Sequence, residues 1–429
     1  MSQTNFESLY HALSSLPRAR GVVLAHVISL PEPLRGMITQ LMRRCRRDAI
    51  ALSELADELL LSQSEANLLA AKLTDKGFLQ ETTADTGAIL YQVRYGYKQG
   101  TDWPLAVRQA LLDVNAIQLI EVKSDLGAGT RGANLGPDAL KVAAFQCNRQ
   151  YFADYPAIEI RSTLSPRKSS GSRHANNIEK LFELFERVGS TVAHSIKEGR
   201  FPILIAGDHS TAAATMAGIK LALPDSRLGV VWIDAHADIH SPYTTPSGNL
   251  HGMPVAAALG EDNLAAQINH PQDETIKYWE AIKNLGCIAP KFQYGDLVYV
   301  AVRDTEAAED LLIDRHRIRN FTTAEVRNKG VGKVAREALG LLAHCDRIYI
   351  SFDVDSMDSS VSEGTGTPVA GGLTELEAGD LILSLLQEPK VCCFEICEVN
   401  PTLDERNRMA ENAFDILARV TDRVSADYT

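Results

Sequence analysis

Hydrophobic residues near the start of the chain recur at helical spacing. The pattern predicts one helix over residues 34–47 and a second over residues 51–61. A third helix begins at Ser62 or Ser64, because a serine side chain can accept a hydrogen bond from a free backbone N–H of the first turn. It runs to about residue 76, where Gly77 ends it.

The pattern then changes to one typical of strands. Residues 78–82 and 88–95 are predicted strands, joined by a turn at residues 84–87. Three helices followed by a hairpin are the outline of a winged-helix domain. We therefore expect a small winged-helix-like α+β domain over residues 1–100, followed by a linker over residues 101–115.

A winged helix suggests DNA binding, with the third helix in the major groove. The charge distribution argues against this function. Residues 31–100 carry nine basic and nine acidic side chains, and the whole chain has a net charge of −12. A helix that reads DNA normally presents a basic face, whereas the lysines of the third helix are matched by acidic residues. Four arginines within residues 43–47 leave DNA contact open, but we favour a packing, oligomerising or regulatory module.

The remaining chain alternates short β-branched runs with helical patterns. This alternation predicts an α/β domain over residues 116–429, with a parallel sheet flanked by helices. The predicted strands are residues 116–122, 202–205, 228–233, 297–302, 347–352 and 391–396. The predicted helices include residues 177–197, 333–343 and 374–386.

The sequence also bears on where the protein is found. No stretch reaches the roughly 18 consecutive apolar residues of a membrane span, and the first residues lack the pattern of a secretion signal. The seven cysteines show no paired spacing, so neither a disulfide framework nor a zinc knuckle is indicated. We expect a cytoplasmic protein without a membrane partner and with reduced, buried thiols.

Three motifs rich in acidic residues and histidine follow three of the predicted strands. They are AGDHS at residues 206–210, DAHAD at 234–238 and SFDVD at 351–355. In parallel sheets the chemistry gathers at the carboxyl ends of the strands, and alternate residues of an extended chain share a face. We therefore expect one group of side chains to converge: His209, Asp234, His236, Asp238, Asp353 and Asp355.

This group has the composition of a metal centre. Carboxylates packed together repel one another unless cations neutralise them. Oxygen ligands with some imidazole and no thiolate suit Mn²⁺, and less well Fe²⁺, Co²⁺ or Ni²⁺, better than structural zinc. Six ligands exceed what one ion with open positions needs, so we expect two ions that share bridging carboxylates.

The chain resembles the arginase/agmatinase family of ureohydrolases over about three-quarters of its length, from residue 116 onwards. Besides the three metal motifs, the resemblance rests on GAGTRGANLGP at residues 127–137, GTGTP at 364–368 and EVNP at 398–401. It implies a three-layer α/β/α fold and a binuclear manganese centre held by the six residues given above. It also implies a homo-oligomer, a trimer or a hexamer.

The expected chemistry assigns roles around the metal centre. Metal ions lower the pKa of water and so make a hydroxide available near neutral pH, and Asp238 would accept a hydrogen bond from it. Glu398 matches the family carboxylate that pairs with the planar guanidinium. His251, in SGNLHGMP, matches the family's proton-shuttling histidine. Because imidazole titrates near physiological pH, it would protonate the leaving amine.

The SGNLHG motif is more similar to arginases than to agmatinases. By that resemblance Thr245, Ser247 and Asn249 would bind the α-carboxylate of the substrate. Glu306 and Glu309 lie in a stretch that resembles the acidic segment holding the α-amino group.

Two residues near the expected substrate depart from the arginase pattern. His240 stands where arginases usually have asparagine, and Glu306 stands where aspartate is usual. Residues 358–363 also lack the family's usual prolines. With Thr367 of the GTGTP motif, His240 is expected among the substrate contacts. Because substrate choice responds to small changes in a pocket, these departures bear on which guanidino compound is hydrolysed.

The sequence thus predicts a binuclear-metal hydrolase that converts L-arginine to L-ornithine and urea. One alternative is the same reaction on another guanidino compound: homoarginine, guanidinobutyrate, agmatine or guanidine. A third hypothesis is a non-catalytic, metal-dependent sensor that signals through the winged-helix domain. The complete ligand set with His251 and Glu398 argues against the sensor, which has no need of a proton shuttle.

Overall fold

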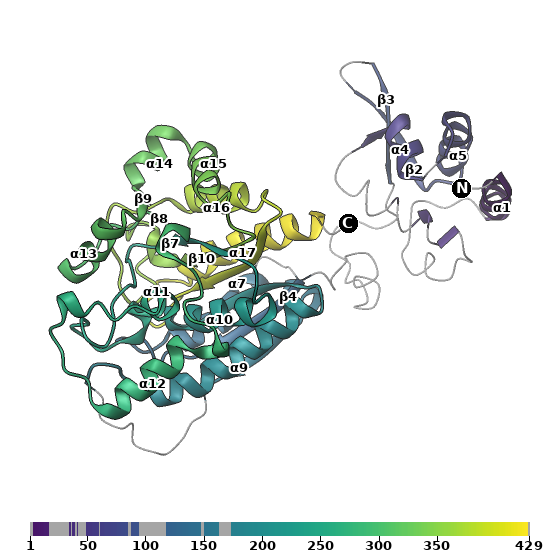
Figure 1. The fold of residues 1–429 in the computed structure, drawn as a ribbon. Helices are drawn as coiled ribbons and strands as arrows, with labels where there is room; N and C mark the ends of the chain where they lie inside the picture. Colours follow the sequence, from purple (N-terminus) through teal and green to yellow (C-terminus); the bar gives the residue numbers. More distant parts are fainter. Residues whose placement is uncertain are drawn as a thin grey trace. The chain divides into compact units, whose positions relative to one another are not determined.

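The chain divides into two compact units, Met1–Val114 and Asn115–Thr429, each with its own buried hydrophobic core (Figure 1). In this computed structural model the described residues are 3–16, 34–35, 37–38, 41, 49–59, 61–84, 87–93, 117–146, 150–162 and 173–427.

The smaller unit combines helices with a three-stranded antiparallel sheet. Its helices are α1 (Gln3–Ser15), α4 (Leu52–Glu58) and α5 (Gln63–Asp75). Its strands are β1 (Ile50–Ala51), β2 (Leu79–Thr83) and β3 (Ile89–Val93), in the order β1-β3-β2. The second and third predicted helices and both strands of the predicted hairpin are confirmed, whereas α1 lies in a segment that the pattern left unassigned.

Ser62, and not Ser64, caps α5. The Ser62 side chain accepts a hydrogen bond from the Glu65 N–H, and Glu65 Oε2 accepts one from the Ser62 N–H at 2.9 Å. Gly77 has a φ of +81°, a left-handed conformation that ends the helix without steric cost.

Part of the first predicted helix lies among the described residues. Leu34, Met37, Ile38 and Leu41 are buried in the core of the smaller unit. Most of the rest of that segment, including the arginines of residues 43–47, lies outside the described residues, as does the predicted linker at 101–115. The winged-helix assignment therefore stays a prediction.

The larger unit is built on an eight-stranded sheet in which every neighbouring pair is parallel. The strand order is β5-β4-β6-β11-β10-β7-β8-β9. The strands are β4 (Ile117–Lys123), β5 (Ala157–Arg161), β6 (Phe201–Ala206), β7 (Leu228–Ile233), β8 (Leu297–Val300), β9 (Arg319–Phe321), β10 (Arg347–Asp353) and β11 (Val391–Cys397). All six predicted strands are present, and the short edge strands β5 and β9 were missed.

Helices cover both faces of this sheet, which gives three layers (Figure 1). One layer contains α9 and α10, which pack together with α11 and α12, and the other contains α14 to α17 with α7. The helices are α7 (Gly136–Gln146), α8 (Tyr151–Asp154), α9 (Ile178–Lys197), α10 (Ala212–Ala222), α11 (Pro254–Leu259), α12 (Asp273–Lys283), α13 (Ala307–His316), α14 (Thr323–Lys329), α15 (Val331–Leu341), α16 (Glu375–Leu385) and α17 (Arg408–Asp427).

The central strands are buried on both sides. Strands β6 and β7 contain only buried residues, because helices cover both faces. This explains why their sequences are continuous apolar runs. Among the described residues, no helix has the length and apolar character needed to cross a bilayer.

The five cysteines within the described residues are free. The expectation that the thiols are buried is wrong for Cys287, which is exposed in a short helical turn, and Cys392 is only partly buried. Cys45 and Cys147 lie outside the described residues.

Candidate metal centre

Four neighbouring strands at the middle of the sheet, β6, β11, β10 and β7, end at the same edge because they run parallel. The chain turns directly after each one. Asp353 is the last residue of β10, Asp234 follows β7, and Glu398 follows β11. His209 opens a short helical turn just after β6. This topology brings together side chains that are far apart in the sequence.

The first group of side chains is centred on His209. Its Nδ1 lies 3.0 Å from Asp234 Oδ2, 3.1 Å from Asp238 Oδ2 and 3.1 Å from Asp353 Oδ2. All four residues are buried. Four of the six predicted ligands therefore meet around one nitrogen.

The second group is centred on His236. Its Nδ1 lies 3.0 Å from Asp355 Oδ2 and 3.5 Å from Asp234 Oδ1. Asp234 thus offers one carboxylate oxygen to each group. This is the arrangement of a carboxylate that bridges two adjacent cation sites, and it accounts for the remaining two predicted ligands.

The residues of these groups fit divalent cations. His209 Nδ1 is buried and makes no hydrogen bond to any described residue, although three carboxylate oxygens lie within 3.1 Å of it. Burial, with the charge of Asp234 added, raises the pKa of Asp238 to about 6. Cations at the two groups would satisfy the nitrogen and neutralise the carboxylates. Imidazole and carboxylate donors suit a first-row transition metal.

One sulfur atom lies beside the first group, and the sequence reasoning missed it. Cys397 Sγ lies 3.7 Å from Asp353 Oδ2 and donates to the carbonyl oxygen of Phe352. Burial raises the pKa of the Cys397 thiol well above its ordinary value. The sulfur lies close enough to His209 and Asp353 to form a candidate ligand group with them, so a thiol stands beside the nitrogen and oxygen donors that the sequence predicted.

Two further residues orient the ligands of the first group. The Trp232 ring stacks on the His209 ring, with centroids 4.1 Å apart, and its Nε1 donates to Asp234 Oδ2 at 2.9 Å. His209 Nε2 lies 2.7 Å from Ser351 Oγ. Trp232 stands two positions before Asp234, and Ser351 stands two positions before Asp353. That spacing is the signal that would have identified them.

The second group has supporting residues as well. Thr367 Oγ1 donates to Asp355 Oδ2 at 3.0 Å, so this predicted substrate contact is held against a candidate metal ligand. His236 Nε2 lies 3.7 Å from Asp304 Oδ2, and these two residues form an isolated β-bridge. Asp304 was not singled out from the sequence.

His251 and Glu398 form a pair next to the first group. His251 Nδ1 lies 3.1 Å from Glu398 Oε1, which also accepts the His209 N–H at 2.9 Å. Burial lowers the pKa of His251, but the hydrogen bond to Glu398 and its negative charge outweigh burial and raise that pKa to about 9. The imidazole therefore holds a proton near neutral pH.

Two of these residues adopt a strained backbone conformation. Asp238 has a φ of +51° and Glu398 a φ of +65°. Non-glycine residues rarely adopt the left-handed region, and those that do cluster at functional sites. Both carboxylates contact His209: Asp238 lies at its Nδ1, and Glu398 accepts its backbone N–H.

The loop predicted to bind a carboxylate is held by its own side chains. Thr245 Oγ1 accepts the Gly248 N–H at 3.0 Å, and Ser247 Oγ accepts the Asn249 N–H at 3.2 Å. Asn249 Oδ1 accepts a hydrogen bond from Asn176 Nδ2 at 3.0 Å. Asn176 comes from the segment before α9 and was missed.

The predicted amino-binding residues lie at the start of α13. Glu309 is buried, and its two oxygens accept the N–H groups of Ile239 and Glu306 at 3.2 and 3.1 Å. Burial raises the pKa of Glu309 to about 8. His240 Nε2 lies 3.6 Å from Oε2 of both Glu306 and Glu309.

The glycine-rich loop after β4 packs against the turn that carries His209. Gly127 N–H donates to Asp208 Oδ2 at 3.0 Å, and Gly127 O accepts the His251 N–H at 3.1 Å. A Cβ at Gly127 would lie 2.5 Å from side-chain atoms of Asp208 and Ser210. Only glycine permits this close approach, and so the loop ties His251 to the His209 turn.

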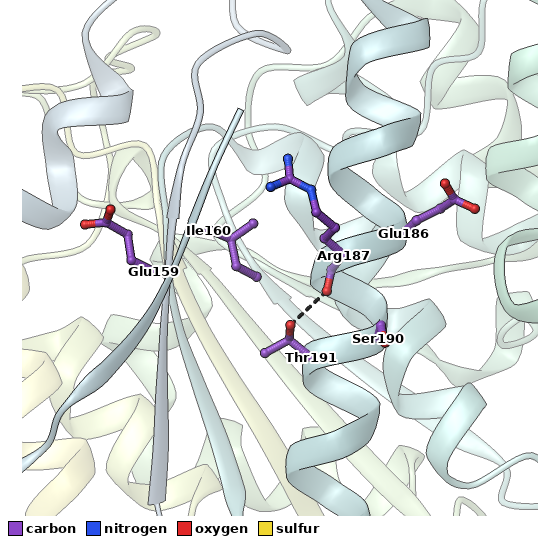
Figure 2. A pocket seen from close by; sticks show the side chains of 6 residues that line it. All are labelled: Glu159, Ile160, Glu186, Arg187, Ser190 and Thr191. Atoms are coloured by element: carbon purple, nitrogen blue, oxygen red, sulfur yellow. Dashed lines mark hydrogen bonds between the residues drawn. The ribbon is translucent and has the colours of Figure 1, made fainter. Parts of the chain in front are cut away.

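A cavity elsewhere holds none of these residues. It is an open depression between β5 and α9, and Figure 2 shows its lining. The lining residues are Glu159, Ile160, Glu186, Arg187, Ser190 and Thr191. Arg187 Nη2 donates to the carbonyl group of Arg161, and Thr191 Oγ1 donates to that of Arg187.

Comparison with known proteins agrees with this geometry. The family model described as "Arginase family" matches residues 115–421. The chain belongs to the arginase family. This is a family of metal-dependent ureohydrolases, so the enzyme class predicted from the motifs is confirmed, as is the arginase-like fold.

Individual members of the arginase family match most of the larger unit. An arginase of Bacillus caldovelox is 35% identical over 303 residues, which cover 69% of this chain and 95% of that protein. An arginase of Brevibacillus brevis is 32% identical, with 71% of this chain and 97% of that protein covered. The solved structure of the Bacillus caldovelox arginase has a TM-score of 0.61 at 33% identity, and covers 71% of this chain and 97% of that one.

Proposed function

We propose that this member of the arginase family hydrolyses L-arginine to L-ornithine and urea. The observation that carries the proposal is the pair of groups that share Asp234, with the His251–Glu398 pair beside them. The relatives named arginase support the choice of substrate. The same reaction on another guanidino compound remains the alternative, because His240 and Glu306 depart from the arginase pattern.

We propose two Mn²⁺ ions as the native metals, with Ni²⁺, Co²⁺ or Fe²⁺ as substitutes. His209, Asp238 and Asp353 would hold one ion, His236 and Asp355 the other, and Asp234 both. When bound, such ions supply a water acidic enough to attack a guanidinium carbon.

The side chains around this centre would orient the water, bind the guanidinium and supply a proton. Asp238 would accept a hydrogen bond from the attacking water and so orient it. Glu398 uses Oε1 for His209 N–H and His251, which leaves acceptor capacity on Oε2 for the guanidinium. His251 would give the proton on its imidazole to the leaving amine. Its raised pKa keeps that proton available.

The α-carboxylate and α-amino groups of the substrate would be bound by two different sets of residues. Thr245, Ser247 and Asn249 lie on the loop before His251, where their polar groups would receive the α-carboxylate. Glu306 and Glu309 carry the acceptors suited to the α-amino group. Arginine has both groups, whereas agmatine lacks the carboxylate.

The other features are proposed from the resemblance and the composition. We propose a cytoplasmic homo-oligomer, a trimer or a hexamer, in which the smaller unit is an oligomerising or regulatory module. Nucleic acid is not a proposed partner, because the charge balance of residues 31–100 is neutral.

Urea release tests this proposal. The purified full-length protein is freed of metal, reloaded with one metal at a time, and given arginine, homoarginine, agmatine, guanidinobutyrate or guanidine. We expect the highest kcat/KM for arginine with Mn²⁺. A higher value for another compound would replace arginine by that compound, and no urea from any of them would overturn the enzyme assignment.

A further inference from the structure

His240 is a buried histidine with one unsatisfied nitrogen. Its side chain is about nine-tenths buried, and Nδ1 lies 3.1 Å from Thr244 Oγ1. Nε2 is fully buried, and no hydrogen bond to it is present among the described residues. A buried polar atom without a hydrogen-bond partner destabilises the folded protein. The buried position of Nε2 therefore needs an explanation.

The proton of His240 can be placed from its neighbours. Thr244 Oγ1 accepts the Ser241 N–H at 3.0 Å, and its own O–H is then free to donate to His240 Nδ1. That assignment leaves the ring proton on Nε2. The opposite tautomer would place a lone pair towards the carboxylate of Glu306, 3.6 Å away, which is repulsive.

Glu306 and Glu309, whose carboxylates both lie near Nε2, differ in how freely their side chains can move. Glu309 is fixed, because it is buried and accepts N–H groups from Ile239 and Glu306. Glu306 has a side chain that is more than half exposed. His240 Nε2 lies 3.6 Å from each of them. The nitrogen that carries the proton is therefore equally far from a fixed acceptor and a movable one.

We propose that His240 is a positioning residue that holds Glu306 beside Glu309 as one paired acceptor for the amino group of the substrate. This inference rests on the proposed function, since it concerns the same site. A primary ammonium has three N–H donors and is best received by several acceptors together. His240 therefore acts on the amino end of the substrate, and the carboxylate end is left to Thr245, Ser247 and Asn249.

Two substitutions of His240 distinguish the roles of its two ring nitrogens. The amide nitrogen of glutamine reaches the position of Nε2, whereas that of asparagine reaches the position of Nδ1. His240→Gln therefore keeps a donor towards Glu306 and Glu309, and His240→Asn removes it. Both replace the ring by an amide, so general damage to the site affects both variants.

Three substrates distinguish contacts to the amino group of arginine from contacts to its carboxylate. Agmatine lacks only the carboxylate, and 5-guanidinopentanoate lacks only the amino group. In His240→Asn we expect the KM of arginine and agmatine to rise by about fivefold or more relative to that of 5-guanidinopentanoate. We expect a smaller change in kcat, and substantial recovery of the KM ratio in His240→Gln.

Each other outcome has a definite meaning. Equal KM changes for all three substrates, or equal effects of the two variants, would overturn the positioning role. Losses confined to arginine and 5-guanidinopentanoate would assign His240 to the carboxylate instead. If the parent protein releases urea from none of the three, the proposed function fails. Binding of ornithine, putrescine and 5-aminopentanoate, measured by calorimetry, then tests His240 by the same comparison.

Discussion

Nδ1 of His251 lies 3.1 Å from Oε1 of Glu398, although the two residues are 147 positions apart in the chain. The same oxygen accepts the backbone N–H of His209. One carboxylate therefore links the proposed proton donor to the turn that carries a candidate metal ligand, and its hydrogen bond and charge raise the pKa of the imidazole.

Replacing Glu398 by glutamine should lower the pKa of His251. In the parent, burial lowers this pKa, but the hydrogen bond and charge of Glu398 outweigh burial and raise it to about 9. In Glu398→Gln the charge is lost and burial remains. An NMR titration of the imidazole signals in metal-free protein measures the difference. Unchanged titration of His251 would show that Glu398 does not control its proton.

Asp234→Asn should impair both metal sites at once. Asp234 offers Oδ2 to the His209 group and Oδ1 to the His236 group, so loss of its charge weakens both. We expect urea release to fall by more than about 100-fold and bound metal to fall below one ion per chain. Metal analysis by mass spectrometry, with exposed Asp225→Asn as the control, checks this. Two ions retained in Asp234→Asn would refute the bridging role.

A pair of tryptophans allows a matched test of ligand orientation. Trp232 Nε1 donates to Asp234 Oδ2, and Trp279 Nε1 donates to Asp262 Oδ1 at 2.7 Å, away from the metal groups. Both tryptophans are buried. Trp232→Phe should weaken metal binding by roughly 10- to 100-fold, because the N–H that orients the ligand is lost. Trp279→Phe should change metal affinity far less, and equal losses would indicate general destabilisation.

The smaller unit can be tested by removal. Its core consists of its own residues, from Leu9 to Val93, so the larger unit keeps its own core when residues 1–100 are deleted. We expect the shortened protein to keep bound metal and to differ from the parent in oligomer size or in the arginine dependence of its rate. Analytical ultracentrifugation and steady-state kinetics measure the two properties. Identical values for both proteins would exclude an oligomerising or regulatory role.

The sequence predicted the parts of the fold whose pattern is set by burial. Strands β6 and β7 lie between two helical layers, so their apolar runs were easy to recognise. The edge strand β5 has mostly part-buried or exposed residues, and β9 has only three residues, so neither gave such a run. A strand at the edge of a sheet has one neighbour and fewer buried positions, which weakens its pattern.

The six candidate ligands could be proposed from the sequence because alternate residues at the end of a strand lie on the same face. Trp232 and Ser351 escaped notice because an aromatic or a serine within a strand has many ordinary roles. Asn176 and Gly127 depend on tertiary contacts with Asn249 and Asp208 that no local pattern reveals. The contact between His240 and the two glutamates likewise requires the fold, since it joins residues 240, 306 and 309.

Glu309, a proposed contact of the substrate amino group, also affects how stability depends on pH. Its pKa is about 8 in the folded protein because of burial, against an ordinary value of 4.5. Between these values the unfolded chain has lost the proton and the folded chain still holds it. Unfolding therefore releases a proton in this window, and the stability contribution falls as the pH rises from about 4.5 to about 8.

Glutamine does not titrate, so the variant Glu309→Gln does not lose stability in this way as the pH rises. In the metal-free proteins, we expect the Tm of Glu309→Gln to exceed that of the parent by an amount that increases from pH 5 to pH 8. In the metal-loaded variant, we expect the KM for arginine to be higher than in the parent. Asp314→Asn, an exposed change in the same helix, is the control. A Tm difference that is constant with pH would mean that Glu309 is already ionised in the folded protein. In that case Glu309 meets the amino group of the substrate as a charged carboxylate and does not have to lose a proton first.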